Sequence, residues 1–138
     1  MQSELDLKKI VHDHGYKATP QRLAILSVFS KNHRPFSAEE IYKKLKKTGT
    51  DLVTIYRTLT SFEKGGVLKR VDLRKDSVQF ELAHGHHHHI VCTICGRVED
   101  FDDCDLETVT KKIVSKSAHF KSIREHSLEL FGVCRKCS

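Results

Sequence analysis

The 138-residue sequence contains no apolar run long enough to cross a bilayer, so we expect no membrane-spanning segment. No secretory signal peptide opens it, and we therefore expect a cytoplasmic protein whose thiols stay reduced. The sequence also lacks His-Glu-x-x-His, and no His-x-Glu stands before a Pro-Cys-x-x-Cys, so it has neither of two common signatures of catalytic zinc. These absences argue against a membrane protein, a secreted disulfide scaffold and a zinc enzyme.

Cysteine is missing from the first 82 residues, which carry all of the net positive charge. Residues 1–82 contain sixteen Lys and Arg against ten Asp and Glu, whereas residues 83–138 contain eight of each charge, seven of the ten histidines and all five cysteines. This asymmetry indicates a polyanion-binding module joined to a metal-binding module, although a surplus of six charges can also be a solvated surface. The length allows two small domains, which we place at residues 1–82 and 86–138 with a connector at 83–85.

The second module opens on four consecutive histidines followed by two β-branched residues. Imidazole is a principal ligand of zinc and its neighbours in the first transition row. The β-branched residues favour an extended chain, in which alternate side chains face opposite ways. His86 and His88 would then serve one side and His87 and His89 the other, so one run can supply two separate metal sites.

Two Cys-x-x-Cys pairs, Cys92 with Cys95 and Cys134 with Cys137, enclose the rest of this module. Four thiols in two such pairs are typical of a closed tetrahedral zinc site. The alternative is two structural disulfides, which fits poorly with a reduced compartment. We therefore predict one structural Zn²⁺ per subunit, bound by these four cysteines and joining the two ends of the module.

Helices and one hairpin are predicted for the basic half. The capping signals are Thr19-Pro20, the capping box Ser37-Ala-Glu-Glu40, and Thr50 or Asp51, while Gly15 and Gly65-Gly66 are helix stops. The predicted elements are helices over 5–11, from 20, from 38 and over 52–64, a loop over 31–36, and strands over 67–73 and 77–82. Helices followed by a hairpin predict a winged helix-turn-helix.

The helix over 52–64 has two different faces when projected at 100° per residue. Its apolar face carries Leu52, Ile55, Leu59 and Phe62, and the opposite face carries Val53, Thr54, Arg57, Thr60 and Ser61, with Tyr56 at the edge. Small, hydroxyl-bearing and arginine side chains in the first turns suit the reading of base edges in a major groove. The lysines of the preceding helix either contact phosphate or cover a solvated face.

The second module is predicted to contain strands over 87–92 and 97–101, a helix over 105–117 and a strand over 120–131. Leu106, Val109, Ile113 and Val114 are expected to line the inner face of that helix. A module this small needs a partner subunit to bury its apolar surface.

At this point the sequence resembles the ferric uptake regulator family of metal-dependent repressors. The motifs that carry the resemblance are Thr19-Pro20-Gln21-Arg22, Ser37-Ala-Glu-Glu40, Val53-Thr-Ile-Tyr-Arg57, Phe80-Glu-Leu82, residues 86–89 with Cys92-x-x-Cys95-Gly96, and His126 ahead of Cys134-x-x-Cys137. The resemblance implies an α+β fold, with an N-terminal winged helix-turn-helix and a small α/β dimerisation domain stapled by a four-cysteine zinc site. It also implies a homodimer that binds a palindromic double-stranded DNA operator.

The resemblance further implies two metal sites beside the structural zinc and a set of DNA contacts. The regulatory site falls on His33, Glu81, His87 and His89. A second site falls on His86, His88, Glu107 and His126, with Asp100 as a neighbouring acidic candidate. The DNA contacts fall on Arg22, Thr54, Tyr56, Arg57 and Arg70. Cys104 is an extra thiol that some zinc-sensing members share, or else a small buried residue at a helix start.

Glu81 is the residue that informs the choice of regulatory metal. Zinc-sensing relatives tend to have cysteine there, whereas carboxylate with imidazoles suits Fe²⁺ or Mn²⁺ better. The sequence therefore favours an iron-type sensor, with a zinc sensor as the first alternative and a peroxide-responsive repressor as another. A zinc enzyme and a metal-buffering protein remain competing classes, but a buffer would not need a winged helix.

Overall fold

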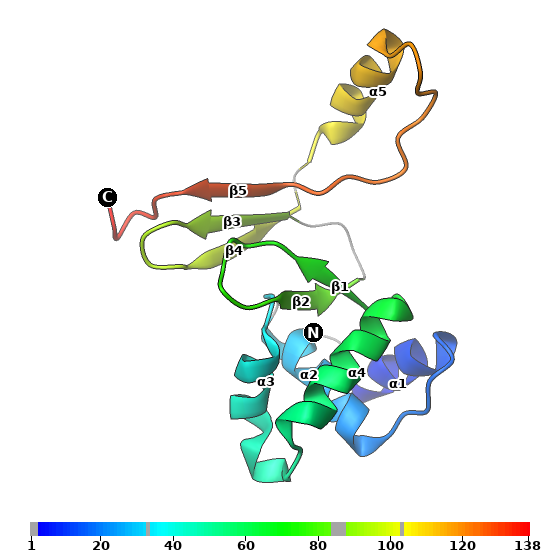
Figure 1. Ribbon diagram of the computed structural model, residues 1–138, viewed down its shortest axis with the longest axis vertical. Helices are drawn as coiled ribbons and strands as arrows, with labels where there is room; N and C mark the ends of the chain where they lie inside the picture. Colours follow the sequence, from blue (N-terminus) through cyan, green and yellow to red (C-terminus); the bar gives the residue numbers. More distant parts are fainter. Residues whose placement is uncertain (1–2, 33, 84–87, 103) are drawn as a thin grey trace. The chain divides into compact units, whose positions relative to one another are not determined.

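The computed structural model describes residues 3–32, 34–83, 88–102 and 104–138. The chain divides into two compact units, Met1–Gly85 and His86–Ser138, and Figure 1 shows the helices and strands of each. Most of the predicted connector at 83–85 lies outside the described residues, so the placement of a hinge there stays a prediction. Among the described residues, no helix combines the length and the apolar character needed to span a bilayer.

The first unit contains the helices α1 (Glu4–Asp13), α2 (Pro20–Asn32), α3 (Ala38–Leu45) and α4 (Leu52–Lys64), with a 3₁₀ turn at Lys46–Thr48. The predicted capping box is present, since Ser37 and Glu40 each accept a hydrogen bond from the other's backbone N–H at 3.2 Å. Asp51, rather than Thr50, caps α4 by accepting from the Thr54 N–H at 2.7 Å. Local side-chain chemistry thus sets where these helices begin.

The core of the first unit is formed by the inner faces of its helices and hairpin. The predicted apolar face of α4 is buried, with Ile55, Leu59 and Phe62 fully enclosed. Tyr16 fixes the loop after α1 to α4, because its hydroxyl donates to the Ser61 carbonyl at 2.5 Å. A Cβ at Gly65 would lie 2.2 Å from that hydroxyl oxygen, so only glycine permits this approach.

The wing consists of β1 (Leu68–Val71) paired antiparallel with β2 (Gln79–Leu82), both shorter than predicted. Arg74 takes a positive φ of 55° in the turn between them. The predicted loop over 31–36 was wrong at both ends. Helix α2 continues to Asn32, and Phe36 pairs with Phe80 through N–H···O bonds of 2.9 and 2.8 Å. A single-residue bridge has no periodicity, so the sequence carries no signal for it.

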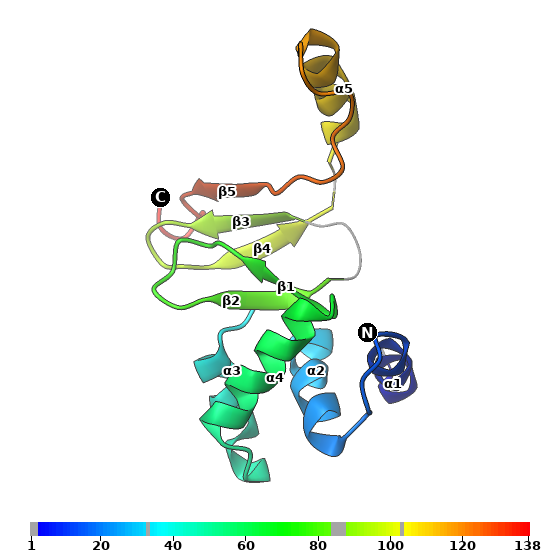
Figure 2. The same cartoon turned by 45° about the vertical axis from the view of Figure 1, so that its right-hand side comes forward.

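The second unit contains β3 (His88–Cys92), β4 (Val98–Phe101), α5 (Leu106–Lys116) and β5 (Glu129–Gly132). The strand order is β4-β3-β5, with β4 antiparallel and β5 parallel to β3. The predicted strand over 120–131 was wrong for most of its length, because β5 begins only at Glu129. Its partner β3 is five residues long and offers no pairing to the residues before that point. Figures 1 and 2 show the segment after α5 returning to the sheet as an extended loop.

Helix α5 extends away from the sheet of its own unit (Figures 1 and 2), and none of its residues is buried. Val109 is 46% exposed and Ile113 is 54% exposed, so the predicted inner face of this helix has no core to face within the described part of one chain. Phe120 and Ile123 in the following loop are exposed as well. The second unit therefore presents an apolar surface that its own sheet does not cover.

Candidate functional site

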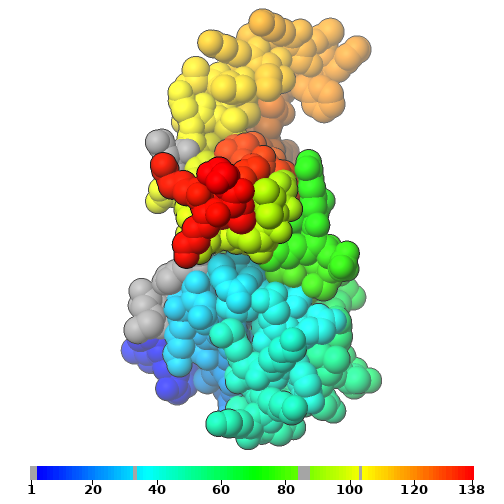
Figure 3. All heavy atoms as spheres, turned by 90° about the vertical axis from the view of Figure 1, so that its left-hand side faces the viewer, coloured from blue at the N-terminus to red at the C-terminus, as the bar shows by residue number. Residues whose placement is uncertain are grey.

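The four cysteines of the two Cys-x-x-Cys pairs converge at one end of the sheet. Their Sγ atoms all lie within 4.8 Å of one another, and those of Cys95 and Cys134 are 3.7 Å apart. Zn–S bonds of about 2.3 Å in a tetrahedron place two sulfurs about 3.8 Å apart, so this spacing fits zinc. Figure 3 shows the C-terminal residues, in red, lying against the yellow-green segment that follows β3.

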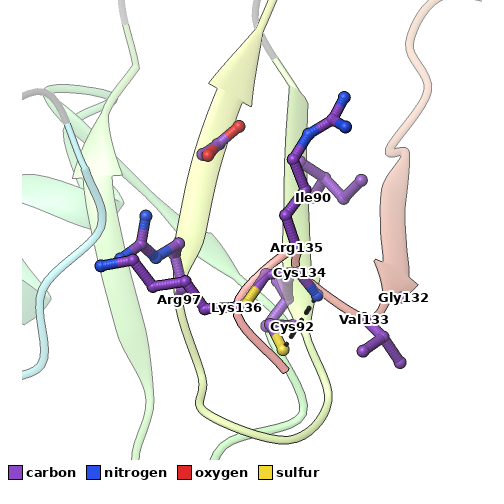
Figure 4. A pocket seen from close by; sticks show the side chains of 10 residues that line it. Ile90, Cys92, Arg97, Gly132, Val133, Cys134, Arg135 and Lys136 are labelled. Atoms are coloured by element: carbon purple, nitrogen blue, oxygen red, sulfur yellow. Dashed lines mark hydrogen bonds between the residues drawn. The ribbon is translucent and has the colours of Figure 1, made fainter. Parts of the chain in front are cut away.

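Strand pairing and two tight turns bring these cysteines together. Cys92 ends β3 opposite Gly132 of the parallel strand β5. Cys134 follows Gly132 by two residues, so both Cys-x-x-Cys pairs begin at the same end of the sheet. The Gly96 N–H donates to the Cys92 carbonyl at 2.9 Å, in a turn where Gly96 has a φ of 76° that other residues rarely adopt. The Cys134 N–H donates to the Cys92 Sγ at 3.4 Å, as the dashed line in Figure 4 marks.

Two thiols of the cluster, those of Cys92 and Cys134, have lowered pKa values. Backbone N–H groups of Cys95 and Cys134 lower the pKa of the Cys92 thiol to about 6. The Cys137 thiol donates to Cys134, which lowers the pKa of Cys134 and raises the pKa of Cys137 to about 12. All five cysteines of the chain are free thiols, so the alternative of two disulfides does not describe this structure. Thiolates held together in this way fit a closed site for a soft or borderline dication.

A second cluster in the same unit joins His88, Cys104 and His126, whose ligand atoms also lie within 4.8 Å of one another. The Nε2 atoms of His88 and His126 are 3.3 Å apart, and the Cys104 Sγ is 3.8 Å from the His126 Nε2. His88 is buried and its ring lies 5.6 Å from the ring of Phe101. The resemblance pairs His88 with His126 in the second site but gives Cys104 no place in it.

The other residues predicted for the second site lie elsewhere or outside the described residues. His86 belongs to the latter group. Glu107 is exposed and pairs with Lys111 at 2.9 Å one turn along α5. Asp100 is the register partner of His89 across β3 and β4, whereas His88 is opposite Phe101. Because directly opposed residues share a face of the sheet, Asp100 lies on the face of His89 and not on that of His88.

Two residues of the predicted regulatory site, His33 and His87, lie outside the described residues. Glu81 is buried in β2, where it accepts from the Lys69 ammonium at 3.2 Å across the hairpin. His89 is buried in β3, with its Nδ1 4.0 Å from a carboxylate oxygen of Glu129 on β5. His89 thus has two acidic register partners in its own unit, Asp100 on one side and Glu129 on the other.

The outer face of α4 is the candidate nucleic-acid surface of the first unit. Arg57 is exposed, Tyr56 is 44% exposed and Thr54 is half-buried. Tyr56 and Arg57 line a shallow groove together with Tyr16 and residues of the last turns of α4. The predicted base-reading side chains therefore stand on the side of α4 that the core does not use.

The other two predicted DNA contacts make contacts within the unit. Arg22 donates to the Lys17 carbonyl at 2.9 Å, and its guanidinium lies 5.5 Å from the centre of the Tyr16 ring. Arg70 donates to Glu63 at 2.6 Å and stacks over Phe80. These contacts hold both arginines at the margin of the winged helix, where each would have to exchange a protein partner for a phosphate.

Comparison with known proteins gives the same family over most of the chain. Residues 13–131 match the family model described as "Ferric uptake regulator family". The ferric uptake regulation protein of Legionella pneumophila is 42% identical over 130 residues, which cover 91% of this chain and 93% of that protein. The structure of a ferric uptake regulator from Francisella tularensis with iron has a TM-score of 0.74 and 34% identity, covering 89% of this chain and 95% of the other. That of the Helicobacter pylori regulator, described as having three functional metal-binding sites, has a TM-score of 0.79 and 26% identity, covering 99% and 97%.

Proposed function

The chain belongs to the ferric uptake regulator family, and from this premise we propose that it is a repressor that binds a palindromic DNA operator as a homodimer when its regulatory metal is bound. Members of the family regulate transcription in response to metal and are not enzymes. The protein would act in the cytoplasm, where it meets its operator. The observation that carries the proposal is the joint presence in one chain of an outward recognition helix and two clusters of metal-ligating side chains.

The DNA-binding role is supported by the chemistry of α4. Its first turns present Thr54, Tyr56 and Arg57 on the side opposite its buried apolar residues. Arginine reads guanine edges through two hydrogen bonds, and a tyrosine ring can contact a thymine methyl or a phosphate. Arg22 and Arg70 at the margin would contact the phosphate backbone and fix the register of the winged helix.

The homodimer is supported by the apolar surface of the second unit. The exposed apolar residues of α5 and of the following loop need a cover, and a second copy of the same unit supplies an identical apolar surface. Two recognition helices related by a twofold axis would match a palindromic site.

The structural metal is proposed to be zinc at Cys92, Cys95, Cys134 and Cys137. When bound, zinc would supply a fixed cross-link between the two ends of the unit. The described core of this unit is small, so we expect the cross-link to be part of its folding free energy.

The regulatory metal is proposed to be Fe²⁺, held by His33, Glu81, His87 and His89. The carboxylate of Glu81 and the acidic register partner of His89, Asp100, supply hard oxygen donors that suit Fe²⁺ or Mn²⁺. A relative of known structure is described with iron. The first alternative is a zinc sensor, and a peroxide-responsive repressor is another; Cys104 beside two histidines is the observation that favours the zinc alternative.

The experiment that tests this function combines metal analysis with DNA selection. The purified full-length protein is first analysed for tightly bound metal, and then used to select duplexes from a random pool with Fe²⁺, Mn²⁺ or Zn²⁺ present. We expect one zinc per chain before any addition, and recovery of a palindromic sequence that the protein binds much more tightly with Fe²⁺ than without metal. Binding that is equally tight after removal of the added metal would contradict a metal-dependent repressor.

A further inference from the structure

We propose that the thiolate of Cys104 is a metal ligand, which together with His88 and His126 forms a site selective for Zn²⁺ over Fe²⁺ and Mn²⁺. The proposal rests on the metal-dependent repressor proposed above and changes the donor set of the second metal site that the sequence predicts. Three residues from three parts of the chain meet here: His88 in β3, Cys104 just before α5, and His126 in the loop before β5.

The distances in this cluster match a coordination shell. With Zn–N bonds of about 2.0–2.1 Å and a Zn–S bond of about 2.3 Å, tetrahedral geometry places two nitrogens about 3.3 Å apart and a sulfur about 3.6 Å from a nitrogen. The corresponding separations are 3.3 Å between the Nε2 atoms of His88 and His126, and 3.8 Å between the Cys104 Sγ and the His126 Nε2. The three donor atoms can therefore take one ion with only a small adjustment.

The surroundings of the cluster hold its histidines in place. The ring of His88 is buried, and the ring of the exposed His126 lies tilted against it, with 5.1 Å between centroids and 37° between planes. Cys104 is only half-buried, so metal can enter and leave from its side. A water molecule could complete the shell. Glu107, in the first turn of α5 and outside the cluster, is in an exposed ion pair with Lys111 that is worth little in water and would not hold this carboxylate back from a metal.

The donor chemistry sets the metal preference. A site made only of imidazoles and carboxylates accepts Fe²⁺ and Mn²⁺ readily, whereas one thiolate in a tetrahedral shell of three protein ligands favours Zn²⁺. The chain would then hold zinc in two chemically different places: a closed four-thiolate site and a more open site with two imidazoles and one thiolate. The second would exchange with the free metal around it.

The test is the reactivity of Cys104 in the full-length protein that retains its four-cysteine zinc. The protein is alkylated with iodoacetamide in the presence of Zn²⁺, Co²⁺ or Mn²⁺, and the modified peptides are identified by mass. At a free metal concentration about ten times the dissociation constant, about one site in eleven is open, so we expect Zn²⁺ to slow alkylation of Cys104 about tenfold. Mn²⁺ at the same concentration should leave the rate unchanged.

Two variants make the test specific. His126→Ala should abolish the zinc protection of Cys104, while His119→Ala, which changes an exposed histidine outside the cluster, should preserve it. Cys104→Ser should remove the sulfur-to-cobalt charge-transfer band that Co²⁺ produces in the parent, and both proteins keep the four-cysteine zinc as an internal reference.

Several outcomes would overturn the proposal. One is binding of a second metal equivalent that depends on His126 but gives Cys104 no protection, which would leave the second site intact without its thiolate. Another is a protein that binds no second equivalent of metal, which would exclude the second site. Metal-dependent DNA binding would still be tested separately, by the selection experiment described above. Protection by Zn²⁺ that persists in His126→Ala would also contradict the assignment.

Discussion

The hydroxyl of Tyr56 on α4 donates a hydrogen bond to a carboxylate oxygen of Glu39 on α3. This contact joins the first turn of α3 to the outer face of the recognition helix, and it orients the tyrosine ring before any DNA is present. The same hydrogen bond lowers the pKa of Glu39 and raises the pKa of Tyr56, because it favours a charged carboxylate and a protonated phenol.

The Glu39 contact predicts a pH dependence of stability. Because the pKa of Glu39 is lowered on folding, its stabilising contribution is present above the ordinary carboxylate value of 4.5 and is lost as the pH falls through the folded-state value. Glu39→Gln and Tyr56→Phe should each reduce the fall in stability below that pH, measured as the urea midpoint between about pH 7 and about pH 3. The effect should be small because the pair is exposed, and a double variant should add nothing to either single one. Additive effects of the two changes would show that the residues act independently.

Arg57 is predicted to read a base. Arg57→Ala should weaken binding to the selected operator by about 1–3 kcal/mol and relax preference at one base pair. Lys43→Ala on α3 is the matched control, since an exposed lysine that meets only phosphate should weaken binding to all sequences alike and lower the salt dependence. Titrations by fluorescence anisotropy at several salt concentrations separate the two. Equal losses on specific and random DNA for Arg57→Ala would contradict base reading.

The four-cysteine cluster is predicted to support folding of the second unit. Cys92→Ser should release one zinc per chain and lower the melting temperature, because the metal's binding free energy is part of the folding free energy. Cys104→Ser is the control, since Cys104 lies outside this cluster and its loss should leave that zinc bound. Metal analysis and calorimetry on both variants provide the measurement. A Cys92→Ser protein that melts like its parent would exclude a structural role.

The first unit could be predicted largely from local chemistry. Capping residues such as Ser37 and Asp51, and the period of the apolar residues in α4, act within a few positions of one another. The bridge between Phe36 and Phe80 could not be predicted, because it depends on a backbone approach between segments more than forty residues apart.

At the metal sites, too, local features could be predicted from the sequence and long-range approaches could not. Strand alternation separates His88 from His89, and the structure keeps them on different sides with different partners. The side on which Asp100 lies depends on the register between β3 and β4, which alternation within one strand does not determine. The proximity of Cys104 to His126 arises from the path of the loop after α5, and no spacing in the sequence encodes it.

The regulatory switch is proposed to act through four ligands, of which Glu81 and His89 belong to the described residues. If metal ties these ligands together, each ligand variant should remain dimeric and keep its structural zinc while losing metal-dependent DNA binding. In the closed state of the predicted hinge the ligands of both units would meet at one metal, and in the open state they would not. A shift from mostly open to mostly closed requires the metal to prefer the closed state by about 5.5 kcal/mol, which several strong ligands can supply. His89→Ala should therefore bind the operator weakly at any Fe²⁺ concentration, and His119→Ala should behave like the parent.

The role of Glu81 as a metal ligand can be tested separately, because its carboxylate forms an ion pair with the Lys69 ammonium at 3.2 Å. A metal that uses Glu81 must displace this ammonium, so Lys69→Gln should lower the Fe²⁺ concentration needed for half-maximal operator binding. Glu81→Cys should instead shift the preference from Fe²⁺ toward Zn²⁺, since sulfur replaces oxygen in the shell. Operator affinity measured against free Fe²⁺ and free Zn²⁺ for the parent and both variants decides the matter. If Lys69→Gln needs as much Fe²⁺ as the parent and Glu81→Cys keeps its metal preference, Glu81 is not a ligand, and the cluster of His88, Cys104 and His126 becomes the candidate for the sensor.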